Sequence, residues 1–328
     1  MDKKIKLWKF SPILKQTLWG GDKIASLKRI PDSPGRVGES WELSGVEGNI
    51  SVVAEGPCAG MSLTELIDRE KESLMGTAAY QRFGHNFPLL VKFIDAQQDL
   101  SIQVHPTDEQ ARSMGKPCGK TEMWVLMDGS SGDAFIRVGF NEKITPETYK
   151  QKVADGTICD VIERHAVVAG DCYFLPASCI HSIGAGCLLL EIQQTSDVTY
   201  RIFDFNRRDA NGNFRQLHTE EAARCINFST DQNYHRPYQL RKNELTQIVD
   251  CRYFTTHALD VDGEYHADLS KLDSFIIVVS VKGSGTVQAD DSEPMSLKAG
   301  ETLLVAAATQ QLTLTGDMKI VTTSIHSL

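Results

Sequence analysis

The chain has 328 residues, 41% of them hydrophobic and 23% charged, which is ordinary for a soluble globular protein with an extensive core. Its net charge of -9 argues against a general nucleic-acid-binding protein, although a few local cations could still hold an anionic small substrate. No run of 18 apolar residues and no signal peptide is found, so we expect no membrane-spanning helix. The eight cysteines form no CxxC pair, and a reduced, cytoplasmic protein is expected.

The first hundred residues are predicted to form strands around one helical stretch. Strands are expected at 5–21, ending in a turn at Trp19-Gly20-Gly21, at 37–55 and at 87–105. The helical stretch covers 62–82, because Ser62 and Glu65 fit a capping box and apolar residues follow at helical spacing.

Residues 100–129 hold the densest group of chemically active side chains. Alternation along the first strand places Leu100, Ile102 and Val104 on one face, and Ser101, Gln103 and His105 on the other. A Pro106-Thr107-Asp108 segment ends this strand and a polar loop follows. A second strand begins near Glu122 and stops at Asp128-Gly129. We therefore expect Gln103, His105, Lys120 and Glu122 to converge in one pocket.

The remaining residues are predicted to be strand-rich, with two further helices. One helix covers about 145–164, with Thr145 as N-cap and Pro146 at its first position, and a short one covers 219–227. Short strands with turns fill 165–205 and 247–328, which is typical of a sandwich or barrel. A boundary in the polar stretch 233–243 divides the chain into 1–240 and 241–328.

A weak internal repeat relates the two predicted domains. The segment from Gly170 through Pro176 to His181 matches the segment from Gly300 to Gln311, and both read as a strand, a turn and a strand. Gln311 replaces the histidine in the second copy. The sequence thus predicts two related β-barrels with a site only in the first.

Four residues fit an open metal site. Gln103 and His105 share a strand face, Glu122 opens the next strand, and His181 begins the strand after the Pro176 turn. Imidazole, carboxylate and amide oxygen ligands suit zinc or a similar divalent ion. The other seven histidines are interpreted as structural or exposed: His85, His165, His218, His235, His257, His266 and His326.

These motifs resemble those of the cupin superfamily. Gly170, Pro176 and His181 match its second motif, and Glu122 with Gly129 matches the end of its first. Gln103 and His105 replace the usual paired histidines, and the gap to Glu122 is longer, which is the pattern of the type I phosphomannose isomerases in their short bacterial form. Four further segments are similar to that family, GESWELSG, FPLLVKFIDAQQDLSIQVHP, PASCIHSIG and LEIQQTSDVTYRIFDFNR.

The resemblance implies an all-β double cupin with small helical insertions at about 62–82, 145–164 and 219–227. Residues 1–240 would form the catalytic domain, and 241–328 a smaller cupin-like domain without metal ligands. It also implies interconversion of mannose 6-phosphate and fructose 6-phosphate through a cis-enediol. One Zn²⁺ per chain is expected on Gln103, His105, Glu122 and His181, with another divalent ion as the alternative.

Further residues are expected around the substrate. The resemblance implies Arg201 as the active-site arginine, with Lys92 and Ser101 near the phosphate. Lys120, Glu191 and Asp197 are the candidate acids and bases. Three more candidates for contacts to the substrate are Glu39, Arg207 and Trp19.

Other readings of the chain are a non-catalytic sugar- or sugar-phosphate-binding cupin and an iron-dependent oxygenase. The intact ligand set with Lys120 and Arg201 favours an isomerase over a binding protein. Gln103 and Glu122 in the ligand positions favour a redox-inert metal. We do not expect a bifunctional isomerase–nucleotidyltransferase, because the sequence shows no Gly-rich nucleotide domain and is too short for one. We expect a monomer or homodimer that binds a hexose 6-phosphate and neither nucleic acid nor membrane.

Overall fold

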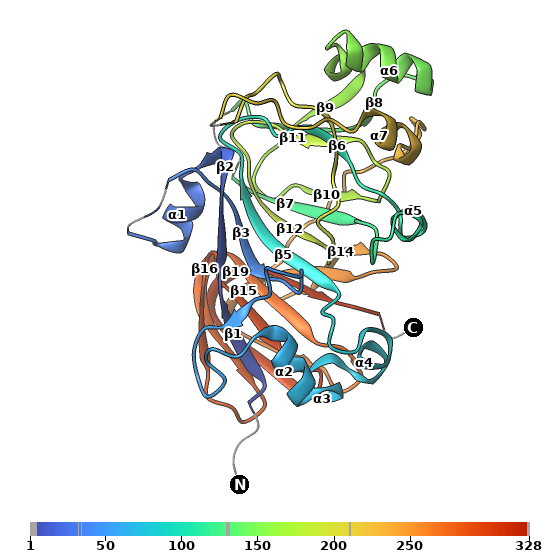
Figure 1. Ribbon diagram of the computed structural model, residues 1–328. Helices are drawn as coiled ribbons and strands as arrows, with labels where there is room; N and C mark the ends of the chain where they lie inside the picture. Colours follow the sequence, from blue (N-terminus) through green and yellow to red (C-terminus); the bar gives the residue numbers. More distant parts are fainter. Residues whose placement is uncertain (1–4, 32, 34, 129–131, 210, 327–328) are drawn as a thin grey trace.

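A computed structural model describes residues 5–31, 33, 35–128, 132–209 and 211–326. Two β-barrels lie one above the other, and small helices flank them (Figure 1). This architecture confirms the predicted all-β class with helical insertions. Among the described residues, no helix is long and apolar enough to cross a membrane.

The first barrel is built from two antiparallel sheets. The larger has the order β10 (Cys172–Leu175), β7 (Glu122–Asp128), β12 (Leu188–Gln194), β5 (Leu89–Asp95), β3 (Val37–Leu43) and β2 (Ile13–Gly21). The smaller has the order β13 (Tyr200–Phe203), β6 (Ile102–Val104), β11 (His181–Ile183), β8 (Phe135–Phe140) and β9 (Ile162–Ala166).

The central strands of the larger sheet are buried on both faces. On β12, Leu189 packs inside the first barrel, whereas Leu190 packs in the core shared with the second barrel. Because side chains alternate along a strand, Glu191 points to the same side as Leu189. The alternation of side chains along β12 therefore places the charged Glu191 inside the first barrel, on the side of Leu189.

The second barrel is one eight-stranded sheet. Its main path runs through β14 (Thr246–Asp250), β15 (Thr255–Asp268), β19 (Gln311–Ser324), β16 (Ile276–Ala289), β18 (Thr302–Val305), β1 (Leu7–Ser11) and β4 (Val52–Val53), and β17 (Met295–Lys298) pairs with β16. The N-terminal strand β1 thus pairs with β18, with Leu7 opposite Val305. The predicted division of the chain near 240 does not anticipate this strand exchange.

The helical prediction for 62–82 is confirmed as three short helices, α2 (Leu63–Glu70), α3 (Glu72–Met75) and α4 (Thr77–Phe83). The Ser62–Glu65 capping box is present at the start of α2. The breaks fall at Lys71 and Gly76, whose φ angles are 49° and 88°. A Cβ on Gly76 would lie 2.4 Å from the Asp273 carbonyl oxygen, so glycine is required there.

Several details differ from the sequence prediction. Helix α6 (Pro146–Ala154) has the predicted cap, but it ends ten residues early, and a 3₁₀ turn at Ile158–Val161 and strand β9 replace its predicted last part. Trp19-Gly20-Gly21 ends strand β2 instead of forming a turn. The polar loop after Pro106 contains α5 (Asp108–Ser113).

The other helices are α7 (Thr219–Cys225), as predicted, and α1 (Lys23–Lys28), which was not predicted. The Thr107–Gln110 capping box of α5 was a readable signal that the prediction missed.

The internal repeat predicted from the sequence is present in the structure. Strands β10 and β11 start two and eleven residues after Gly170, and β18 and β19 start at the same offsets from Gly300. Both glycines have positive φ angles, 99° and 83°. The two copies therefore make the same turn between the same pair of strands.

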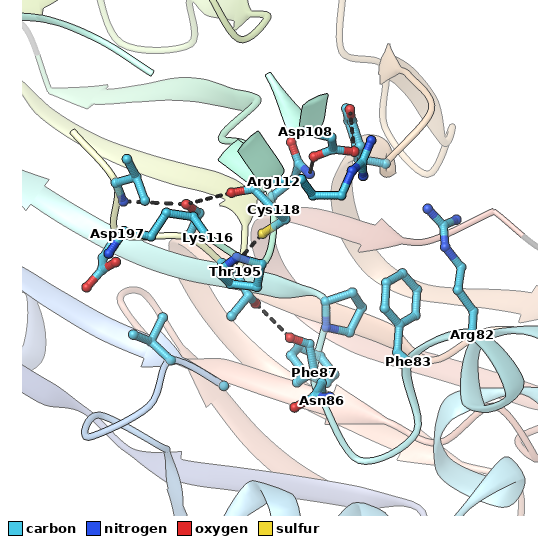
Figure 2. Close-up of a pocket in the computed structure, with 18 of the residues that line it drawn as sticks. Arg82, Phe83, Asn86, Phe87, Asp108, Arg112, Lys116, Cys118, Thr195 and Asp197 are labelled. Carbon is cyan, nitrogen blue, oxygen red and sulfur yellow. Dashed lines mark hydrogen bonds between the residues drawn. The ribbon is translucent and has the colours of Figure 1, made fainter. Parts of the chain in front are cut away.

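Two cavities are relevant to function. One, of about 900 Å³, is lined by residues of the first barrel. The other, of about 860 Å³, lies where helices α4 and α5 meet the second barrel (Figure 2).

Candidate active site

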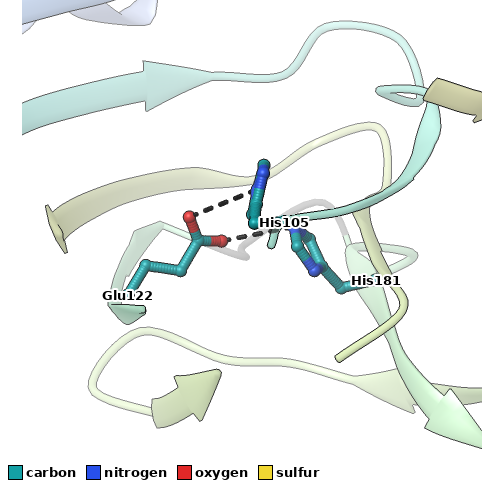
Figure 3. A group of neighbouring side chains, drawn as sticks. All are labelled: His105, Glu122 and His181. Atoms are coloured by element: carbon teal, nitrogen blue, oxygen red, sulfur yellow. Dashed lines mark ion pairs between the residues drawn. The ribbon is translucent and has the colours of Figure 1, made fainter. Parts of the chain in front are cut away.

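Three of the four predicted metal-binding residues, His105, Glu122 and His181, converge inside the first barrel (Figure 3). His181 lies opposite Gln103 on the paired strands β11 and β6, and Glu122 is the first residue of β7. Ligand atoms of His105, Glu122 and His181 all lie within 4.8 Å of one another, and all three side chains are buried. This is the only group of histidine, cysteine and carboxylate side chains with metal-ligand spacing in the described part of the chain.

Both histidines are held in the orientation that a metal ligand needs. Nδ1 of His105 donates to the Val198 carbonyl oxygen, and Nδ1 of His181 donates to the Cys179 carbonyl oxygen, each at 2.9 Å. The Nε2 atoms are therefore the unprotonated ones, and they lie 3.6 and 3.3 Å from the two carboxylate oxygens of Glu122. Burial lowers the pKa of His181 to about 4, so its imidazole is neutral at pH 7.

The Gln103 side chain completes the set. Its Nε2 lies 3.2 Å from His181 Nε2. The oxygen and nitrogen of an amide exchange places on a half turn of the group, so the same side chain can present Oε1 to a cation. Gln103 thus fits the fourth position predicted for it.

The donor set fits a divalent metal ion. Oε1 of Glu122 is buried and accepts no hydrogen bond from any described residue. Burial and the neighbouring Glu191 carboxylate raise the pKa of Glu122 to about 7, which reflects the cost of an ionised carboxylate in this position. Two neutral imidazoles, one carboxylate and one amide oxygen suit zinc and other divalent ions.

A chain of alternating charges adjoins these ligands. Lys120 Nζ lies 2.5 Å from Glu122 Oε2 and 3.5 Å from Glu191 Oε1, and Lys92 Nζ lies 3.1 Å from the same Glu191 oxygen. Lys92 also lies 3.4 Å from Glu39. All five groups come from adjacent strands of the larger sheet or the loop before β7, and each charge faces one of opposite sign.

This arrangement fixes two protonation states. Burial opposes the ionisation of Glu191, but Lys120 and Lys92 outweigh it and lower the pKa of Glu191 to about 2. Burial likewise disfavours the Lys92 cation, but the carboxylates of Glu191, Glu39 and Glu122 outweigh it and raise the Lys92 pKa. At neutral pH Glu191 is a carboxylate and Lys92 an ammonium.

The 900 Å³ cavity lies against this group and collects most of the predicted site residues. Its lining includes Trp19, Glu39, Lys92, Ser101, Gln103, Lys120, Glu191, Asp197 and Arg201. Arg201 donates from Nη1 to the Gln216 carbonyl oxygen at 3.1 Å, while its buried Nε has no partner among the described residues. Arg201 therefore lines the cavity and keeps one buried donor unpaired among the described residues.

Arg207 is placed differently from the prediction. It does not belong to the cavity lining, and its guanidinium donates to the Asp99 carbonyl oxygen and to Asp204. Arg215 does line the cavity and donates from Nε to the same Asp204 at 2.7 Å. Sequence reasoning missed Arg215 and the exposed Arg36, because neither lies in a segment with a recognisable motif.

Comparisons with known proteins agree with this geometry. Residues 7–123 match the model of the catalytic domain of phosphomannose isomerase type I, and residues 243–325 match that of the cupin domain of mannose-6-phosphate isomerase. Mannose-6-phosphate isomerase ManA of Bacillus subtilis is 35% identical over 84% of this chain and 85% of that protein. A mannose-6-phosphate isomerase of Streptococcus mutans is 29% identical over 94% and 95% of the two chains.

Solved structures show the same fold. The crystal structure of mannose 6-phosphate isomerase from Bacillus subtilis has a TM-score of 0.84 and 29% identity, and the match covers 97% of this chain and 99% of that one. A putative mannosephosphate isomerase from Archaeoglobus fulgidus has a TM-score of 0.79 at 22% identity, with 99% of each chain covered.

Proposed function

The chain belongs to the type I phosphomannose isomerases, and we therefore propose that it interconverts mannose 6-phosphate and fructose 6-phosphate. The observation that carries this proposal is the meeting of His105, Glu122 and His181 beside a cavity that also holds Lys120 and Arg201. A binding protein would not need a buried group of ligands next to paired acids and bases.

We propose Zn²⁺ as the metal, held by Gln103, His105, Glu122 and His181. When bound, such an ion polarises a carbonyl and stabilises the oxygens of an enediol. Backbone carbonyls fix both histidines, so that the two imidazoles already have the orientation that metal binding requires.

Lys120 is the best placed of the proposed proton carriers. Its Nζ contacts Glu122 at 2.5 Å and His105 Nε2 at 3.1 Å, and it lines the substrate cavity. Glu191 is a weak base at neutral pH, because two lysines face it and Trp124 Nε1 donates to its Oε2 at 2.7 Å. We propose that Glu191 positions the Lys120 side chain. We propose that Asp197 contacts the sugar at the rim of the cavity.

The phosphate group is proposed to lie near Arg201 and Arg215. Lys92 is engaged with two carboxylates, whereas Arg201 retains a free donor. Lys92, Ser101, Glu39 and Trp19 remain proposed contacts to the sugar phosphate. Arg207 is proposed to act through Asp204, which it shares with Arg215, instead of contacting the substrate.

The test is a coupled isomerase assay with mannose 6-phosphate and with other hexose phosphates, before and after chelation and after zinc is restored. We expect activity with mannose 6-phosphate that is lost on chelation and returns with zinc. Inactivity on every hexose phosphate with metal restored would favour the non-catalytic binding cupin instead. A cytoplasmic location and a monomeric or dimeric state remain predictions.

A further inference from the structure

The second cavity is shown in close-up in Figure 2. It is lined by residues of α4, of α5 and the loop after it, and of the second barrel. The segment 194–198 lines it as well, and Asp197 belongs to the lining of both cavities. One short piece of chain therefore borders the two cavities.

The lining of this cavity carries cations that form no close ion pair with described residues. Four cations line it, Arg82, Arg112, Lys116 and Arg252. Across the described residues, none of the four lies within 4.0 Å of a carboxylate oxygen. In a chain with a net charge of -9, four such side chains around one cavity favour an anionic ligand.

Three carboxylates, Asp108, Glu47 and Asp197, line the same cavity, so its cations exceed its carboxylates by one, and Arg112 interacts electrostatically with Asp108. Asp108 is already engaged, since it accepts hydrogen bonds from the Gly119 backbone, the Gln194 side chain and the Tyr253 hydroxyl. Glu47 and Asp197 are exposed, as are the four cations, so water screens the charges of both signs. Arginine guanidinium groups suit phosphate, because they bind it through two parallel hydrogen bonds.

Two aromatic rings give the cavity a second recognition element. Phe83 is half-buried, with the Arg82 guanidinium 4.8 Å from its ring centre, and Figure 2 shows the two side by side on α4. Tyr253 lines the cavity from the second barrel. Aromatic faces stack on planar bases, and a volume of about 860 Å³ is in the range of small-molecule sites. We propose that this cavity binds a nucleoside phosphate, with the phosphate on the arginines and the base against an aromatic ring.

Residues that line this cavity also hold the backbone around Lys120 and the proposed metal ligand His105, so a bound nucleotide can change isomerase activity. Asp108 accepts from Gly119 N at 2.9 Å, and Gln194 Oε1 accepts from Thr121 N at 2.9 Å, which fixes the chain on both sides of Lys120. Val198, in the shared segment, holds His105 at 2.9 Å. The binding of the nucleotide does not depend on the proposed isomerase function. The effect of the nucleotide on activity does rest on that proposed function.

The probe is adenosine 5′-monophosphate, titrated by calorimetry into the zinc-loaded full chain, with adenosine and inorganic phosphate in parallel. The lining variant Arg112→Ala/Arg252→Ala is compared with Lys143→Ala/Lys271→Ala, which removes two exposed cations from outside both cavities. We expect saturable binding of the nucleotide, at least tenfold weaker in the lining variant and unchanged in the control. We also expect the nucleotide to change kcat without competing with mannose 6-phosphate.

Three results would overturn the proposal. These are no saturable binding, equal binding of inorganic phosphate and nucleotide, and binding that survives in the lining variant but is lost in Arg201→Ala, which would place the nucleotide in the isomerase cavity. The isomerase assay without nucleotide is read separately. An active isomerase that binds no nucleotide refutes this inference alone, and a nucleotide-binding chain without isomerase activity refutes the proposed function alone.

Discussion

Lys92 and Glu191 face each other on the neighbouring strands β5 and β12, with Nζ 3.1 Å from Oε1 and both side chains buried. Each stabilises the charged form of the other in a place where either charge alone would be costly. The pair stands beside Lys120, so it also sets the electrostatic environment of the proposed proton carrier.

Lys92→Gln should destabilise the protein by about 3–5 kcal/mol, because removal of one partner leaves Glu191 with an uncompensated part of its charge. Urea unfolding at pH 7 measures this. Lys150→Gln is the matched control, since Lys150 pairs with Glu220 at 2.8 Å on the exposed surface and should contribute less than about 1 kcal/mol. Equal effects of the two variants would contradict the burial argument.

His181→Ala should remove bound metal together with activity. The variant loses one of two fixed imidazole ligands, and the remaining residues cannot supply its Nε2. Metal content after dialysis, measured by plasma mass spectrometry, is the readout, and activity is assayed on the same sample. His85→Ala, which changes an exposed histidine, should keep both. Full metal content in His181→Ala would show that the ligand set is wrong.

Arg201→Ala should retain metal but lose about 100-fold or more in kcat/KM, since it removes a charged donor from the substrate cavity. Arg215→Ala should raise KM more than it lowers kcat, as expected for a phosphate contact. Arg207→Ala should affect kcat/KM less than either, because its guanidinium lies outside the cavity lining. Steady-state kinetics of the three variants test the assignment, and normal kinetics in Arg201→Ala would overturn it.

Asp204→Asn should show a pH-dependent loss of stability. Burial raises the pKa of Asp204, but hydrogen bonds from Arg215 and Arg207 outweigh it and hold the pKa below its ordinary value. A carboxylate with a lowered folded-state pKa stabilises fully above about pH 4 and loses that contribution as the pH falls through the folded value. We expect a loss of about 1–3 kcal/mol at pH 7 that shrinks below pH 4. Urea unfolding at both pH values checks this, and a loss independent of pH would contradict it.

Much of the site could be predicted from the sequence because its geometry is local. Gln103 and His105 share a face through strand alternation, and the glycine, proline and histidine of the second motif set a turn of fixed length. The same offsets recur from Gly300, so the matching turn of the second barrel could also be predicted from the sequence. The end of α6 was predicted too late because the apolar residues after it belong to β9, whose place is fixed by pairing with β8.

Only the tertiary structure decided which cations face the cavity. Arg207 and Arg215 have the same chemistry and share the carboxylate of Asp204, and the packing around that group turns Arg215 toward the cavity and Arg207 toward Asp99. Strand β1 pairs with the second barrel through contacts between residues far apart in the chain. The cavity between α4, α5 and that barrel depends on such contacts as well. Alternation and turn chemistry act over a few residues and bring the proposed metal ligands together, whereas the surroundings of the proposed substrate site depend on which distant surfaces pack together.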